Sequence, residues 1–390
     1  EHGRLGRLMS TSIAPVQTRS ERFTSAAHAD FAPVTGIEAE GKLAPVRQLG
    51  DLIDGELLGS RTTLAFDAVD GVSVTWVPRS ESIVGIAGLP EDRASANAWT
   101  STTEVLEIAV TGVISAPLHL DRADLGATPR AAHTLIRAHR GSRATLVISS
   151  TGLARLSENV EIVVEDGAEL TLVSVLEWDD TAAHLGAHFS VVGAHATFKH
   201  IMVSLGGAII RVNPATRLAG DGADGQLLGL SFADAGQHIE HRVFMHHEGP
   251  NTRGRVTYKS ALQGAKAHTV WIGDVLIGAN AVNTDSYEQN RNLVLTVGAR
   301  ADSVPNLEIE TGDIAGAGHA SATGRFDDEQ LFYLQARGIP EDEARRLVVL
   351  GFLMEIIQQI GDAPLEERLR AAVEAELTTD AVAAPSEVAV

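Results

Sequence analysis

The sequence contains no cysteine among its 390 residues. Without thiols, the chain cannot form disulfide bonds, use a thiolate nucleophile or build a cysteine-ligated zinc site. Any metal ligands that it offers must be histidines or oxygen donors, which suit zinc, iron and nickel.

Aromatic residues are also scarce, at 4% of the chain, whereas apolar residues make up 44%. The core must therefore be built from Val, Leu, Ile and Ala, which suits repetitive stacked strands better than a sandwich centred on aromatic rings. Glycine is plentiful, with 37 residues, as a backbone that turns often requires. A chain of this length can bury a large core in more than one packing unit.

Basic residues are few: 31 Lys and Arg stand against 51 Asp and Glu, which gives a net charge of −20. This balance argues against nucleic acid and against an anionic membrane surface as partners. No apolar run reaches the roughly 18 residues of a spanning helix. The first residues lack the apolar core of a signal peptide, and Met9 is a candidate natural start, so we expect a cytoplasmic protein.

Nucleotide-binding and hydrolase motifs are missing as well. The sequence has no G-x-x-x-x-G-K-[ST] loop, no G-x-G-x-x-G between a strand and a helix, and no G-x-S-x-G elbow. A nucleotide-binding function therefore has no support in the sequence.

The middle of the chain, from about residue 104 to 314, is predicted to be nearly all β. Short runs rich in Val, Leu and Ile are bounded there by Gly, Asp or Asn, and no helical period interrupts them. The expected strands are Val105 to Val113, Ala144 to Ser149, Val160 to Glu165, Leu170 to Leu176, Ala196 to Val203, Leu227 to Phe232, Val270 to Ile277 and Asn292 to Val297.

A Gly-Ala pair recurs beside these strands, at irregular spacing. It occurs at Gly167, Gly193, Gly207, Gly222, Gly264, Gly278 and Gly298. A small residue at each corner followed by a short apolar strand is typical of a β-solenoid. A jelly roll or a sandwich would show similar strands, so the pattern alone leaves these folds open.

The N-terminal segment is expected to be disordered up to about residue 20 and partly helical after it. Thr62 to Trp76 alternates weakly around an Asp-Gly turn signal and predicts a hairpin. Leu89 to Trp99 is predicted to be a loop or a short helix.

The C-terminal segment is predicted to be helical. Asp327 and Gln330 resemble a capping box, Gly338 ends the first helix, and Pro340 lies in the first turn of the next. Leu347, Leu350, Met354, Ile357 and Gly361 mark one face of that helix, widened by Val348, Phe352, Ile356 and Ile360. A third helix is expected from Pro364 to Leu377.

The densest histidine cluster predicts either a metal site or polar decoration of a solenoid face. It comprises His238, Glu240, His241, His246, His247 and Glu248. On a strand, His238 and Glu240 would share a face and His241 would point away. His184 and His188 have helical spacing but lie in a strand-like context.

Three aspartates, Asp221, Asp224 and Asp234, allow a second hypothesis. They could act as the paired carboxylates of a β-helix enzyme acting on polysaccharide, or they could be turn residues. No aromatic platform for sugars accompanies them, which favours turns.

A lone imidazole, His319, lies among Gly318, Ala320, Ser321 and Ala322. Because its neighbours are small, another surface can approach it closely. It is either a ligand or contact residue at an interface, or a surface histidine in a turn. Glu308 and Glu310 share one strand face nearby in the sequence.

Three long stretches lie around His319: ARADSVPNLEIETGDI (Ala299 to Ile314), GAGHASATGRFDDEQLFYL (Gly316 to Leu334) and RGIPEDEARRLVVLGF (Arg337 to Phe352). They resemble the SufB/SufD family of iron–sulfur cluster assembly, in its SufD branch and actinobacterial form. Upstream, YKSALQG (Tyr258 to Gly264), HTVWIGDVLI (His268 to Ile277) and NTDSYEQNRNLVL (Asn283 to Leu295) match too. The similarity is dense from about residue 206 to 360.

The chain departs from the family pattern at two places. An N-terminal aromatic motif is replaced by EGKLAPV, Glu40 to Val46, with Gly41 where a tryptophan is usual. Ala317 stands where some members have a cysteine two residues before the histidine, so no role of that cysteine carries over.

The resemblance implies a mainly β fold: a right-handed parallel β-helix core over about residues 101–320, after an N-terminal segment, 1–100, and before a C-terminal helical domain, 321–390. It implies a non-catalytic scaffold subunit that pairs with SufB and binds the ATPase SufC. The sequence leaves open whether the isolated chain forms a homodimer. No cofactor is expected on the chain alone, because clusters are held mainly by cysteine, and an iron–sulfur cluster would be carried transiently by the complex.

The resemblance also implies site residues. His319 lies near the SufB–SufD contact as a candidate cluster or metal ligand. The surface expected to bind SufC comprises Leu331, Phe332, Leu334, Arg337, Gly338, Ile339, Leu347, Leu350 and Met354.

Overall fold

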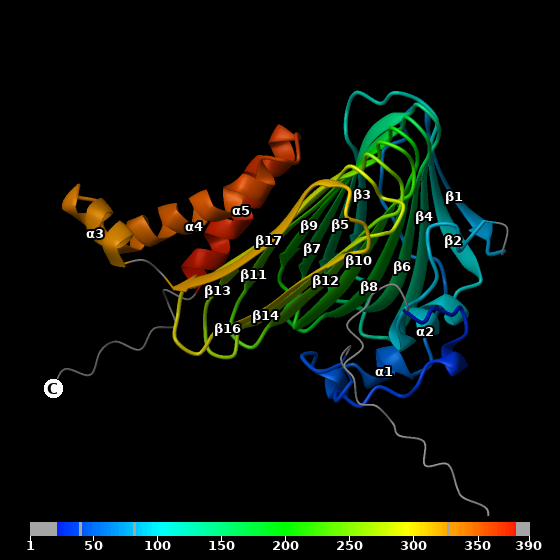
Figure 1. The fold of residues 1–390 in the computed structure, drawn as a ribbon. Helices are drawn as coiled ribbons and strands as arrows, with labels where there is room; N and C mark the ends of the chain where they lie inside the picture. Colours follow the sequence, from blue (N-terminus) through cyan, green and yellow to red (C-terminus); the bar gives the residue numbers. More distant parts are fainter. Residues whose placement is uncertain (1–21, 39–40, 81–82, 326–327, 380–390) are drawn as a thin grey trace, which may run out of the picture.

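The computed structural model describes residues 22–38, 41–80, 83–325 and 328–379. Its centre is a parallel β-solenoid made of two long sheets, with helices on the outside of each (Figure 1). The expected disorder before residue 20, Met9 and the Asp327 cap fall outside the described residues. None of the described helices combines the length and apolarity needed to cross a membrane.

Successive strands alternate between the two sheets, so that each coil of the solenoid adds one strand to each. Sheet A contains β1 (Val72–Pro78), β2 (Glu104–Val110), β4 (Arg130–Ala138), β6 (Arg155–Val164), β8 (Ala183–Val192), β10 (Ile209–Leu218), β12 (His238–His247), β14 (His268–Ile277) and β16 (Arg300–Ile309). Sheet B contains β3 (Leu118–Ala123), β5 (Arg143–Gly152), β7 (Glu169–Trp178), β9 (Thr197–Leu205), β11 (Asp224–Ala233), β13 (Arg253–Leu262), β15 (Thr284–Val294) and β17 (Ile314–Arg325).

Neighbouring strands are parallel, apart from β1, which runs antiparallel to β2. The coils differ in length: the step from Ala183 to its partner Ile209 is shorter than the step from Arg253 to its partner Asp285. The prediction of a parallel β-helix is therefore confirmed, and the jelly roll and sandwich are excluded. The variable coil length explains why the repeat in the sequence is irregular.

One edge of the solenoid turns at a stacked row of residues with positive φ. These residues are Gly141, Gly167, His195, Gly222, Asn251 and Asn283. Each donates its backbone N–H to a carbonyl of the next coil, as Gly167 does to Ala194 and Asn251 does to Val282. Because His and Asn also tolerate this conformation, the same corner is occupied by different residue types.

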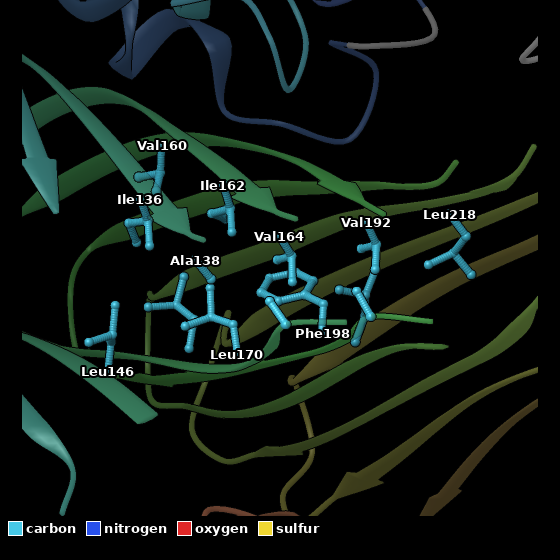
Figure 2. Packing of buried hydrophobic residues seen from close by; sticks show 14 of the residues in the cluster. Ile136, Ala138, Leu146, Val160, Ile162, Val164, Leu170, Val192, Phe198 and Leu218 are labelled. Atoms are coloured by element: carbon cyan, nitrogen blue, oxygen red, sulfur yellow. The ribbon is translucent and has the colours of Figure 1, made fainter. Parts of the chain in front are cut away.

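Strands in the middle of the solenoid, such as β7 and β11, are buried on both faces for most of their length, which favours apolar residues on both. Leu146 of β5 points into the solenoid, where it joins a core with Ile136, Val164 and Phe198 (Figure 2). The next residue, Val147, points outward against the C-terminal helices.

The C-terminal helices are α3 (Asp328–Ala336), α4 (Glu341–Ile357) and α5 (Ala363–Thr379). Gly338, with φ of 85°, ends the first as predicted, and Pro340 is the residue before α4. Helices α4 and α5 cover the outer face of sheet B (Figure 1). The apolar face of α4 that packs inward includes Val349, Leu353, Ile356 and Ile357, whereas Leu347 of the predicted face is 41% exposed.

The N-terminal elements cover the outer face of sheet A. They are η1 (His28–Asp30), η2 (Val46–Gln48), α1 (Gly50–Ile53) and α2 (Arg93–Ser101). The Asp92 carboxylate caps α2 by accepting a hydrogen bond from the Ser95 N–H at 2.8 Å, within the region predicted as loop or short helix. The predicted hairpin from Thr62 to Trp76 is wrong, because the turn at Gly71 leads into β1, whose partner is the later strand β2.

Candidate functional site at the open end of the solenoid

His319 lies on β17, the last strand of sheet B. Strands β16 and β17 each pair with one neighbour, β14 and β15, and no further coil follows them in the described chain. We call this the open end. Backbone N–H and C=O groups along the outer edges of these two strands are available to another strand.

The His319 side chain lies on the side of β17 that faces the inside of the solenoid. Its partner in the sheet register is Glu288 of β15, whose side chain is fully buried. Tyr287, the residue before Glu288 on β15, points outward and is 42% exposed. Because no coil covers the open end, the His319 side chain is 43% exposed although it lies on the inner face.

Glu288 is a buried acid beside this imidazole. Its Oε1 lies 3.6 Å from Nδ1 of His319, which is longer than a hydrogen bond. Neither carboxylate oxygen accepts a hydrogen bond from the described residues. Burial, with a smaller contribution from Asp274, raises the pKa of Glu288 to about 8.

The Glu288 carboxylate is packed from across the solenoid by β14. A Cβ added to Gly273 would lie 2.5 Å from its Oε2 and 2.3 Å from Cη2 of Trp271. Glycine at this position is therefore required for the carboxylate and the indole to lie side by side.

A polar network completes the inner layer of the open end. The Asn292 side-chain amide donates to Oδ1 of Asn290 at 2.9 Å, to Ser303 Oγ at 2.8 Å and to Thr323 Oγ1 at 3.0 Å. The Ser303 hydroxyl donates to the same Asn290 oxygen at 2.7 Å. These contacts join β15, β16 and β17, so they hold the terminal strands together around His319.

The residues flanking His319 leave it accessible. An added Cβ on Gly318 would already contact the Tyr287 ring at 3.3 Å, so this position favours a small residue. Ala317 packs on the inner core. Glu308 and Glu310 do not join His319: Leu307 packs on the inner core, so Glu308 points to the outer face of sheet A.

Two candidate histidines, His184 and His188, lie deeper inside the solenoid on β8, a strand as their context indicated. They line a cavity of about 30 Å³ together with Arg122 and Glu158. Nε2 of His184 lies 2.8 Å from Oε1 of Glu158. Burial lowers the pKa of His188 to about 4, so this imidazole is neutral at physiological pH.

The histidine cluster on β12 divides between the two faces of sheet A. His238 and Glu240 converge as the strand period predicted, with Nε2 of His238 3.2 Å from Oε2 of Glu240, beside Arg242. His241 instead points inside and accepts or donates a hydrogen bond with Ser204 at 3.1 Å. His246 and Glu248 pair with each other near the end of the strand.

His238, Glu240 and Arg242 form a buried ion-pair network, whereas His246 and Glu248 are partly exposed. Glu240 and Arg242 are nearly inaccessible to solvent. Among the described residues, no group of three or more His, Asp and Glu side chains is arranged to hold a metal ion.

Two of the three aspartates in the polysaccharide hypothesis, Asp224 and Asp234, lie too far apart to form a catalytic pair. Asp221 accepts a hydrogen bond from Asn251 at a corner, and Asp224 begins β11. Asp234 follows the other end of this ten-residue strand, about 30 Å away. Since glycosidase carboxylates stand within about 10 Å of each other, Asp224 and Asp234 cannot act on one bond.

The expected partner surface on the C-terminal helices is exposed in part. Phe332 and Tyr333 of α3 are 72% and 55% exposed, and the Arg337 guanidinium lies 4.4 Å from the Tyr333 ring centroid. Leu334, Ile339 and Met354 are partly buried, and Gly338 is exposed. Leu350 is buried against the solenoid, so it holds α4 in place. The Leu331 side chain lies outside the described residues.

Glu288 is the site residue that sequence reasoning missed. The available signal was its distance from His319 along the sequence, which corresponds to one coil. The alternation of buried and exposed residues along β15 then places both on the inner face.

Comparison with known proteins agrees with this architecture. Residues 122–352 match the family model described as "SUF system FeS cluster assembly, SufBD core domain". A curated protein of Mycobacterium tuberculosis, described as an iron-sulfur cluster assembly SufBD family protein, is 47% identical over 347 residues, covering 86% of this chain and 87% of that protein.

Mycobacterium leprae has two curated relatives with the same family description. One is 46% identical over 348 residues, covering 86% of this chain and 88% of that protein. The other is 30% identical over 241 residues, covering 60% of this chain and 27% of that protein. The extent of the family model and the near full-length similarity show that this chain belongs to the SufBD family of iron–sulfur cluster assembly proteins.

Proposed function

We propose that this chain is a SufD-type scaffold subunit, which performs no catalysis itself. It pairs through its open end with a SufB-type subunit and binds a SufC-type ATPase through its C-terminal helices. His319 lies at the SufB contact, where it helps to hold an iron–sulfur cluster whose remaining ligands come from the partner. The cluster is the cargo of the complex and is carried transiently.

The observation that carries the proposal is the open end itself. Two parallel strands, β16 and β17, have unpaired outer edges, and edge strands of this kind are commonly extended by a strand of a partner. The half-exposed imidazole of His319, on β17, faces the interior at this end. The two M. leprae relatives support pairing between different members of the family, because one organism has both.

The second contact is proposed for α3 and the corner that follows it. Phe332 and Tyr333 of α3 are large hydrophobic residues left exposed there, and Leu347 in the first half of α4 is exposed as well. Exposed aromatic side chains next to an arginine are typical of the centre of protein interfaces. Since α4 and α5 are fixed on sheet B, motion of an ATPase bound at α3 would be transmitted to the solenoid.

The test is co-purification of the chain with its genomic SufB-type and SufC-type partners, comparing wild type with His319→Ala. We expect both to form the complex and His319→Ala to contain several-fold less cluster by iron and sulfide analysis. His246→Ala, at a partly exposed histidine on β12, is the matched control and should keep the wild-type cluster content.

Failure of wild type to recruit either partner contradicts the proposal. Equal cluster content in wild type and His319→Ala would leave the scaffold role in place and remove His319 from it. The ATPase contact is tested separately: the complex should raise the hydrolysis rate of the SufC-type subunit, and Phe332→Ala should reduce this stimulation.

A further inference from the structure

A buried carboxylate without hydrogen-bond donors is the least explained group at the open end. The Glu288 side chain is fully buried, and neither of its oxygens accepts a hydrogen bond within the described chain. Removing a polar group from water without providing a partner costs about 1–3 kcal/mol, and more for a charge. A buried polar group without a partner calls for an explanation, and a ligand that binds it would provide one.

The surrounding charges favour a cation. A second acid, Asp274, directly follows Gly273 on β14, the residue that packs against the Glu288 carboxylate. No Arg or Lys of the described residues forms an ion pair with Glu288, whereas the buried acids Glu158 and Glu240 each have an arginine within 4 Å. Glu288 differs from these two in that its one ion-pairing neighbour is a histidine, His319.

The distance between the two side chains suits two ligands of one metal ion. Nδ1 of His319 and Oε1 of Glu288 are 3.6 Å apart. Atoms that each lie about 2.1 Å from a shared tetrahedral ion stand roughly 3.4 Å apart. A direct hydrogen bond would need a separation below about 3.2 Å.

The two side chains differ in how far they can move to meet a metal ion. The Glu288 carboxylate packs beside the Trp271 indole, in space that a side chain at position 273 would fill. His319 is 43% exposed and flanked by small residues, so its ring can adjust to an ion. The solvent-facing side of the pair remains open to water or to ligands from another protein.

We propose that Glu288 and His319 together form a binding site for a divalent transition-metal ion, with ferrous iron as its physiological class. Mixed imidazole and carboxylate donors suit iron, cobalt and zinc. The assignment rests on the proposed function insofar as it names the second protein ligand beside His319. Metal binding by the chain alone does not require a partner or a cluster.

The experiment uses the full chain alone, labelled with ¹⁵N-histidine and titrated with Co²⁺. The His319 ring resonance is assigned by its loss in His319→Gln. We expect it to broaden at about one equivalent of Co²⁺ in wild type, and Glu288→Gln to weaken binding at His319 by at least about tenfold. Glu248→Gln removes the carboxylate beside His246 and should leave binding at His319 unchanged.

Two results would overturn the site. One is Co²⁺ broadening other histidines in wild type while His319 stays sharp. The other is a Co²⁺ affinity at His319 that is the same in Glu288→Gln as in wild type. This holds even if Glu288→Gln changes the protonation of the His319 ring. If Glu288→Gln folds poorly by circular dichroism, Glu288→Asp, which keeps the charge and withdraws it by one methylene, should show the same weakening.

The two proposals can fail separately. Cobalt bound at His319 in the isolated chain, with no cluster in the wild-type complex, would contradict the scaffold role alone. Cluster loss in His319→Ala, with unchanged cobalt affinity in Glu288→Gln, would contradict the Glu288 assignment alone.

Discussion

The two ends of the solenoid are built from the same kind of coil and finished in different ways. At the N-terminal end, β1 runs antiparallel along β2, and Ala65 exchanges backbone hydrogen bonds with Asp121 of β3. Leu64, Val72 and Trp76 pack over the apolar interior there. At the C-terminal end, no described element covers β16 or β17, and the inner layer is a network of Asn, Ser and Thr around Glu288 and His319.

The comparison shows how a solenoid separates stability from function. Each coil contacts its neighbours alone, so the closed end can be optimised for burial while the open end keeps polar groups and unpaired edges. The expected consequence is that matched substitutions have large effects on folding at the closed end and small ones at the open end.

The largest effect is expected from breaking the buried ion pair near the closed end. Arg122 donates to both oxygens of Glu158, at 2.7 and 3.1 Å, with both side chains almost fully buried. Arg122→Ala leaves a buried acid without its arginine, with His184 as its remaining ion-pairing neighbour, and should lower the free energy of unfolding by about 3–5 kcal/mol in urea denaturation.

A surface pair provides the control for Arg122. Arg140 and Asp166 are 75% and 43% exposed, so Arg140→Ala should cost less than about 1 kcal/mol. Similar losses for the two arginine variants would show that the buried pair is not an anchor of the closed end.

A matched leucine truncation compares the two ends directly. Leu120 is fully buried near the closed end, whereas Leu307 is partly buried at the open end. Leu120→Ala should cost about 2–5 kcal/mol, because it opens a cavity in a packed core. Leu307→Ala should cost roughly 1 kcal/mol, since its side chain is already partly solvated. The comparison breaks down if Leu307→Ala is as destabilising as Leu120→Ala by thermal or urea unfolding.

The third prediction concerns pH and has opposite signs at the two ends. Burial raises the pKa of Glu288 from 4.5 to about 8. Between these values the folded chain retains a proton that the unfolded chain releases, so the free energy of unfolding falls as pH rises, by at most about 1.4 kcal/mol per pH unit. Glu288→Gln should flatten this slope between pH 5 and 8.

Glu158 behaves in the opposite way. Burial alone would raise the pKa of Glu158, but Arg122 and His184 outweigh burial and lower this pKa well below the usual 4.5. Its contribution is therefore present above that pH and is lost on acidification below it. A Glu288→Gln variant whose stability still falls with the wild-type slope between pH 5 and 8 would contradict the assignment of this effect to the open end.

The β content of the middle of the chain could be predicted from local chemistry, whereas the choice of a parallel β-helix over a jelly roll or sandwich depended on the family resemblance. Runs such as Val270 to Ile277 became strands because they are buried on both faces. The turn at Gly71 was misjudged as a hairpin, since the partner of β1 lies beyond a helix in the sequence. The prediction of which face of α4 packs inward was partly wrong, because this helix is apolar on most sides. Its position on sheet B decides that Leu353 is buried and Leu347 is not.

Of the two residues in the proposed metal site, one was predictable from the sequence. His319 was identified by its small neighbours and by resemblance, but Glu288 has no local signal. Its importance depends on the register between β15 and β17. Because the coils of this chain differ in length, that register could not be deduced before the strands were placed.

The path of the C-terminal helices also has a consequence for the order of folding. Lys259 of β13 donates to the Phe352 carbonyl of α4 at 3.0 Å, and Asp362, between α4 and α5, pairs with His119 of β3 at 2.9 Å. That second contact joins two positions that lie far apart in the sequence. Coils can assemble from contacts between one coil and the next, whereas the helices can dock fully only after β3 to β13 are stacked in sequence. Helices α4 and α5 can therefore make both contacts only when the stack of coils has its full length. A chain that skipped a coil could not make both.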